Sequence, residues 1–153
     1  QIGDAPMDFG QDYLLQAFDM TEARNLEGEL ISHKAILETR DTVEKNGGVF
    51  VVLLIPTKEE VYRRWTEPEM GAAIIDGLEA PRRRLMAFCE AEGLTCFDAE
   101  AALTAAAADG VHLYYKDDMH LNPAGNAALA DALAAFLDER GITATVRAAL
   151  ATP

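Results

Sequence analysis

The hydrophobic positions of the chain follow two kinds of pattern, one helical and one extended. Between residues 22 and 45, apolar side chains recur every three or four positions, which predicts an amphipathic helix that stops at the Asn-Gly-Gly of residues 46–48. Thr21 is the expected cap of this helix. Residues 49–55 then form an unbroken apolar run that ends at Pro56. This run predicts a strand buried on both faces, as strands of a parallel sheet are.

The same alternation continues to the C-terminus. Further helices are predicted over residues 79–92, 99–108 and 123–140, and short extended segments over 94–97 and 111–115. The remaining segments are expected to be an irregular N-terminus with a short helix between residues 12 and 20, a linker over 66–78, and a tail over 142–153. Helical connections between apolar strands imply right-handed crossovers, so the predicted fold class is α/β: a parallel sheet flanked by helices.

The predicted sheet is small for the length of the chain. The 153 residues suit a single domain, but two secure strands are fewer than an independent sheet needs. We therefore expect this domain to be incomplete, with the missing strands supplied by an upstream part of the same protein or by a second copy of the chain.

Charge and composition narrow the classes of partner. The formal net charge of −13 argues against nucleic acid and anionic membrane surfaces, because such a surface repels phosphate. No apolar run reaches 18 residues, so we expect no membrane insertion by this chain. Cys89 and Cys96 are compatible with a disulfide and equally with two reduced thiols.

The strongest candidate for chemistry lies just before the last predicted helix. Asp117, Asp118 and His120 precede Asn122, a good helix N-cap, and Pro123, which suits the first helical position. A histidine beside a carboxylate can take up and return a proton near neutral pH while the carboxylate fixes its tautomer. The alternative is that these are solvated loop residues, one of which helps to cap the helix.

This block resembles the last conserved block of the SGNH (GDSL-type) hydrolases, in which Asp-x-x-His or Asp-x-His followed by Asn-Pro and Gly opens the final helix. The strand and turn of residues 49–62 and the strand end Cys96-Phe97-Asp98 are similar to the same superfamily, in the right order, so the resemblance covers about residues 45–139. It implies a three-layer, flavodoxin-like α/β/α fold. It also implies His120 as general base with Asp118 as its acid, as in the Asp-x-His form of alginate-acetylation relatives, and Asp117 in reserve.

The family's nucleophile has no counterpart in this sequence. The Gly-Asp-Ser and Gly-x-Asn-Asp blocks that carry the serine and the oxyanion hole are absent, and the one serine, Ser32, lies inside a helical pattern and is expected to be structural. We therefore expect the chain to be the C-terminal part of a longer SGNH-like domain, with its serine upstream, and to be inactive alone. Gly125 and Asn126 belong to the last helix, not to an oxyanion hole.

Other polar residues carry weaker indications. In open α/β sheets, ligands bind beyond the C-terminal ends of the strands, so Lys58 and Tyr62 are candidates to line a substrate cleft, or else belong to a solvated turn. The arginines at 82–84 are expected on a solvated face, and His33 near an apolar one.

Three functions remain open. The first is an ester hydrolase or O-acyltransferase acting on a small-molecule or carbohydrate ester by a Ser-His-Asp route, with no cofactor implied. The second is a non-catalytic module that binds a glycan or a partner protein. The last is a metal site at Asp117, Asp118 and His120, which ranks lowest because adjacent acids seldom both ligate one ion. The family resemblance also implies a location outside the cytoplasm.

Overall fold

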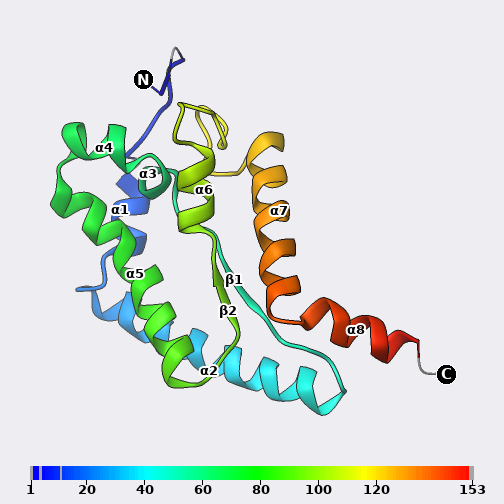
Figure 1. The fold of residues 1–153 in the computed structure, drawn as a ribbon. Coiled ribbons are helices and arrows are strands. Elements are labelled where there is room, and N and C mark those ends of the chain that lie inside the picture. The colour runs from blue at the N-terminus through cyan, green and yellow to red at the C-terminus, as the bar shows by residue number, and fades with distance from the viewer. Residues whose placement is uncertain (1, 4, 11, 152–153) are drawn as a thin grey trace.

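A computed structural model describes residues 2–3, 5–10 and 12–151 of the chain. In the order of the chain, its elements are α1 (Asp12–Phe18), α2 (Ala23–Lys45), β1 (Val52–Leu54), α3 (Lys58–Val61), α4 (Arg63–Met70), α5 (Ala72–Ala91), β2 (Cys96–Asp98), α6 (Glu100–Ala106), α7 (Pro123–Glu139) and α8 (Ile142–Leu150) (Figure 1). The structure is mostly helical around a small parallel sheet of two strands, β1 and β2. The α/β prediction is therefore confirmed.

Helices cover both faces of this sheet. Successive side chains of a strand point to opposite faces. Phe97 points to α7, where its ring centroid lies 4.9 Å from that of Phe136. Its neighbours in β2 point to α5: Cys96 is bonded to Cys89, and Asp98 pairs with an arginine of that helix. In Figure 1, α5 and α7 accordingly lie on either side of the strands.

The two cysteines form a disulfide. Cys89 in the last turns of α5 is bonded to Cys96 in β2, with their Cα atoms 6.2 Å apart. Of the two states that the sequence allowed, the oxidised one is the state of this structure. The bridge joins the end of the crossover helix to the strand that follows it.

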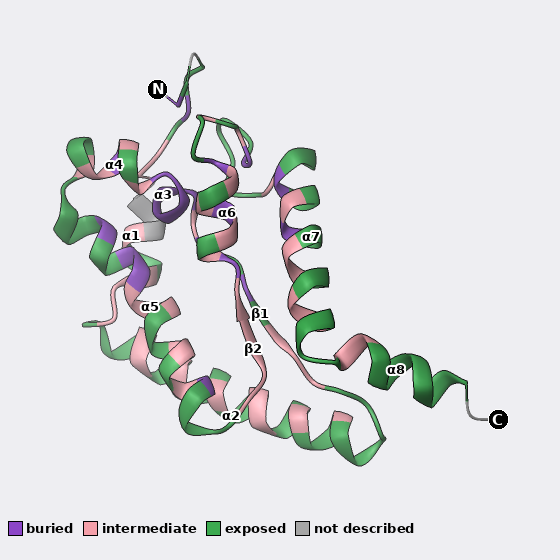
Figure 2. Cartoon of the chain, in the orientation of Figure 1, coloured by how far each residue is buried: buried purple, intermediate pink, exposed green. Residues whose placement is uncertain are grey.

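The main core lies where α3, α6 and the start of α7 meet the segment before α7. Ala99, Leu103 and Ala107 place one face of α6 in it, since they recur at four-residue spacing. α3 is buried in all four of its residues (Figure 2). The other buried members of this cluster are Ile2, Met7, Val61, Tyr62, Leu113, Tyr114 and Leu129.

The apolar run at residues 49–55 is less buried than its sequence predicts. Only Val52–Leu54 form β1, and Ile55 is 51% exposed. The expectation of a strand buried on both faces is wrong. Among the described residues β1 pairs with β2 alone, so along its other edge no side chains of a neighbouring strand lie beside its own. α2 shows the same lack of cover: none of its residues is buried (Figure 2).

Two segments expected to be irregular are helical. The predicted linker over 66–78 contains the end of α4 and the first third of α5, separated at Gly71, whose φ of 89° breaks the helix. Arg63 holds the two helices together, because it pairs with Glu67 in α4 and with Asp76 and Glu79 in α5. The predicted tail contains α8, which follows α7 after Gly141 and has no buried residue.

The start of α2 also differs from its prediction. Glu22 is the N-cap, and its side chain makes no capping bond. Thr21 instead donates through both its backbone N–H and its hydroxyl to Asp19, at 2.8 and 2.6 Å.

Among the described residues, no helix is long and apolar enough to cross a membrane.

Candidate functional site

The segment between α6 and α7, residues 111–122, is an ordered loop, here called the Asp–His loop. Tyr114 and Leu121 form an antiparallel bridge across it, and the backbone N–H of Tyr115 donates to the carbonyl of His120 at 3.1 Å. Residues 116–119 are the turn that this pairing closes. The loop therefore behaves as a short hairpin with the acidic residues at its tip.

The start of α7 fixes the other end of the loop. The side-chain oxygen of Asn122 accepts from the backbone N–H of Gly125 at 3.0 Å, which confirms the predicted N-cap, and Pro123 occupies the first turn. The Asn122 amide also donates to the carbonyls of His112 and Tyr114, at 2.7 and 3.2 Å. A single side chain thus caps the helix and ties the first arm of the loop to it.

Asp118 pairs with His120. One oxygen of the Asp118 carboxylate, Oδ1, accepts from the backbone N–H of His120 at 2.8 Å and also bonds the imidazole Nδ1 of the same residue. Asp117 is exposed, and in the part of the chain that the structure describes no hydrogen bond joins it to the imidazole. The choice between the two acids, open in the sequence, is decided here by geometry.

The protonation of this pair follows from its bonds. The hydrogen bonds from the backbone and then from the side chain of His120 hold the pKa of the Asp118 carboxyl below its usual value. An ionised carboxylate only accepts, so Nδ1 carries the proton, and in the neutral imidazole the free lone pair is then on Nε2. The His120 side chain is 76% exposed, so Nε2 is accessible to a reacting group. This is the geometry of a general base with its orienting acid.

Lys58 and Tyr62 lie beneath the Asp–His loop and not on an open cleft. Lys58 is 2% exposed, and its ammonium donates to the carbonyls of Lys116 and Asp118 at 3.2 and 3.1 Å. The buried Tyr62 hydroxyl donates to the Val111 carbonyl at 3.1 Å and accepts from the N–H of Leu113 at 2.6 Å. Both side chains use their polar groups on the loop backbone; a contact with substrate stays a prediction.

A buried charge cluster lies where the two strands end. Arg82 of α5 bonds Glu60 of α3 at 2.7 Å and Asp98 of β2 at 2.5 Å. Glu60 and Thr57 also form a capping box: Thr57 N–H donates to the Glu60 carboxylate at 2.7 Å, and Glu60 N–H to the Thr57 hydroxyl at 3.3 Å. Desolvation raises the pKa of the Glu60 carboxyl, against the opposing bonds from Arg82.

Sequence reasoning missed this cluster. The expectation that the arginines at 82–84 lie on a solvated face is wrong for Arg82, which is largely buried, and all three pair with carboxylates. One signal was available, because Thr-x-x-Glu directly before an apolar position is the pattern of a capping box. The partners on α5 and β2 leave no such local mark.

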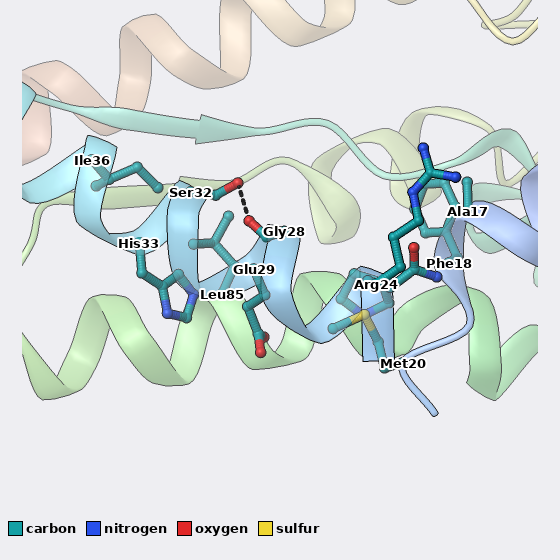
Figure 3. A pocket seen from close by; sticks show the side chains of 12 residues that line it. Ala17, Phe18, Met20, Arg24, Gly28, Glu29, Ser32, His33, Ile36 and Leu85 are labelled. Atoms are coloured by element: carbon teal, nitrogen blue, oxygen red, sulfur yellow. Dashed lines mark hydrogen bonds between the residues drawn. The ribbon is translucent and has the colours of Figure 1, made fainter. Parts of the chain in front are cut away.

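Ser32 and His33 line a different part of the molecule. They border a groove of about 480 Å³ between α1, α2 and α5 (Figure 3). The Ser32 hydroxyl donates to the Gly28 carbonyl one turn earlier at 2.8 Å, the dashed bond of Figure 3, and the His33 ring stacks on that of Phe88 with centroids 3.7 Å apart. In Figure 1, α2 lies at the opposite end of the folded molecule from the Asp–His loop. Ser32 is therefore not a partner of His120 in this structure.

No group of three or more His, Cys, Asp or Glu side chains among the described residues has a geometry that could hold a metal ion. His112, the nearest other histidine in the sequence, bonds the Ile2 carbonyl through Nε2 at 2.8 Å.

Comparison with known proteins gives one family match. No curated protein and no solved structure gives a significant match to the chain. A family model described as "SGNH hydrolase-like domain, acetyltransferase AlgX" matches residues 11–152, which is nearly the whole chain and includes the sheet, the Asp–His loop and α7. The chain belongs to this family of SGNH hydrolase-like domains.

Proposed function

We propose that the chain supplies the general base and its orienting acid to an SGNH-type ester hydrolase or O-acyltransferase. One observation carries the proposal: the Asp118 carboxylate holds Nδ1 of His120 while the ring remains exposed. In this arrangement His120 accepts a proton through Nε2, and Asp118 stabilises the imidazolium that forms. Asp117 stays in reserve as the alternative acid.

The nucleophilic serine would come from outside these 153 residues. Nε2 removes the serine proton as the hydroxyl oxygen attacks the acyl carbonyl of a small-molecule or carbohydrate ester, and the imidazolium returns the proton to the departing alkoxide. Water or a sugar hydroxyl then attacks the acyl-enzyme while Nε2 takes its proton, and the imidazolium returns this proton to the serine oxygen as the acyl group leaves. The size of the sheet supports this proposal, because in the part of the chain that the structure describes only β1 and β2 pair, and each has one edge without a neighbouring strand. Further strands would come from the same protein or from a second copy.

The disulfide supports a location outside the cytoplasm, since disulfides persist in oxidising compartments. A non-catalytic module that binds a glycan or a partner protein is the second candidate. The bond of the Ser32 hydroxyl inside α2 favours it, because this chain by itself then offers no serine to His120.

Hydrolysis of p-nitrophenyl acetate distinguishes these candidates. The assay compares the protein made from its complete reading frame with the 153-residue chain and with the His120→Ala, Asp118→Asn and Asp117→Asn variants of the long form. We expect turnover by the long form only, a loss of about 10²- to 10⁴-fold in kcat for the first two variants, and a change below about threefold for Asp117→Asn. If the long form is inert, or if His120→Ala keeps full activity, the proposed role of His120 is refuted and the binding module is the remaining candidate.

A further inference from the structure

The buried ammonium of Lys58 is unfavourable for the stability of the fold. It is the first residue of α3, where the positive end of the helix disfavours a cation. Its side chain is 2% exposed, and burial lowers the pKa of its ammonium, against the opposing charges of Glu59, Asp8, Asp118 and Asp117. A methionine would fill the same space without either cost. The reason for a lysine at this position must therefore lie in the contacts that its ammonium makes.

The ammonium contacts the tip of the Asp–His loop. It donates to the carbonyls of Lys116 and Asp118, the residues on either side of Asp117, at 3.2 and 3.1 Å. The Lys116 carbonyl also accepts the backbone N–H of Asp8 at 3.0 Å. The Asp118 carbonyl is joined directly to the Cα that bears the catalytic carboxylate. Fixing this carbonyl therefore fixes the direction in which the Asp118 side chain leaves the backbone.

The helix that carries Lys58, α3, is held firmly in place. The Thr57–Glu60 capping box sets the start of α3, and Arg82 ties Glu60 to α5 and to the end of β2. A chain of bonds thus runs from the sheet through α3 to the loop. Asp118 and His120 themselves are exposed, so no packing of their own side chains holds them in place.

We propose that Lys58 is a positioning residue: its ammonium holds the Asp118 carbonyl so that the Asp118 carboxylate meets Nδ1 of His120. This inference rests on the proposed function for its catalytic consequence. It is a different role from the substrate contact predicted for Lys58 from the sequence. Without the ammonium the Asp118 carbonyl is released, and the imidazole loses its fixed tautomer.

The test substitutes Lys58→Met, which keeps the length and apolar stem of the side chain. In the long form we expect kcat for p-nitrophenyl acetate to fall about 10- to 100-fold, with KM changed less than about threefold, because misplacing a catalytic group mainly affects the chemical step. Nitrogen NMR of the His120 ring in the 153-residue chain provides a second readout, observed through the carbon-bound ring protons because an exposed N–H exchanges with water. The Nδ1 signal should be that of a protonated nitrogen in the wild type and should move toward a mixture of tautomers in Lys58→Met and Asp118→Asn.

Two controls separate positioning from stability. Ile75→Ala removes a buried side chain from the separate cluster between α1 and α5, so it should lower the melting temperature while keeping the Nδ1 signal and kcat. Lys34→Met makes the same substitution on the exposed surface of α2 and should leave the melting temperature, the Nδ1 signal and kcat unchanged. If Lys58→Met does not fold, Lys58→Gln replaces it in both measurements.

A folded Lys58 variant that keeps both the Nδ1 signal and kcat within twofold of the wild type overturns the proposal. The same conclusion follows if Ile75→Ala loses the signal equally, because the effect is then one of general stability. An inert wild-type long form refutes the proposed function alone, since the NMR signal still decides whether Lys58 positions the pair.

Discussion

Gly125 is the residue at which a single methyl group should separate the Asp–His loop from α7. A Cβ built there lies 2.0 Å from the Leu113 carbonyl oxygen and 2.9 Å from Cδ2 of Leu121. Real Cβ atoms do not approach other atoms closer than 3.0 Å, so Gly125→Ala must move the helix start or the loop by about 1 Å. The first of these contacts is to backbone, which has no rotamer to change.

The energetic cost can be worked out from the bonds that this movement strains. The Leu113 carbonyl accepts the backbone N–H of Asn122 at 2.9 Å, and the Leu113 N–H donates to the Tyr62 hydroxyl at 2.6 Å. Overpacking typically costs about 1–3 kcal/mol, and a weakened buried hydrogen bond about 1 kcal/mol more. We therefore expect Gly125→Ala to lower the free energy of unfolding by about 2–4 kcal/mol. For a chain of this size, that corresponds to about 4–16 °C in Tm.

Urea and thermal unfolding, followed by circular dichroism, measure this cost. Gly77→Ala is the matched control, because it makes the same change inside a helix where no atom lies within 4 Å of the new Cβ. It should stabilise the chain by about 0.5–1 kcal/mol through helix propensity. A Gly125→Ala protein within about 0.5 kcal/mol of the wild type would show that α7 and the loop do not approach each other this closely, and the account of how the loop is held would be abandoned.

Three further predictions concern the rest of the fold. Reducing the Cys89–Cys96 bridge, which closes a separation of seven residues, should cost about 2–3 kcal/mol; equal urea midpoints with and without dithiothreitol would contradict this. Arg82→Met should cost about 3–5 kcal/mol by chemical denaturation, because it leaves the buried Glu60 carboxylate without its partner, and a loss below 1 kcal/mol would show that the cluster is open to water. The lowered pKa of Asp118 means that its stabilisation is present above about pH 4 and is lost as the pH falls further; unfolding measured between pH 5 and 2 should therefore be less steeply pH-dependent in Asp118→Asn, and identical slopes would argue against the pairing with His120.

Local patterns carried most of the fold prediction. The helix at 123–139 begins where Asn122 and Pro123 predict, since a cap acts on the N–H groups of the next turn and needs nothing distant. The α/β class and the parallel pairing follow from apolar runs separated by a helical crossover. The predictions failed where the burial of a segment depends on which other elements pack against it. The apolar run at 49–55 is partly exposed because β1 has one neighbouring strand, which no periodicity reveals.

The sequence by itself determined the candidate chemistry: an acid and a histidine two residues apart, placed before a capped helix, are close in space whatever the rest of the chain does. Only the tertiary structure decided which acid bonds the imidazole, and that Lys58 and Tyr62 bind the loop backbone. The bonds of Lys58 to the loop join residues 58 and 60 positions apart. Contacts of that range arise from packing a buried α3 beneath the loop, so neither spacing nor residue type predicts them.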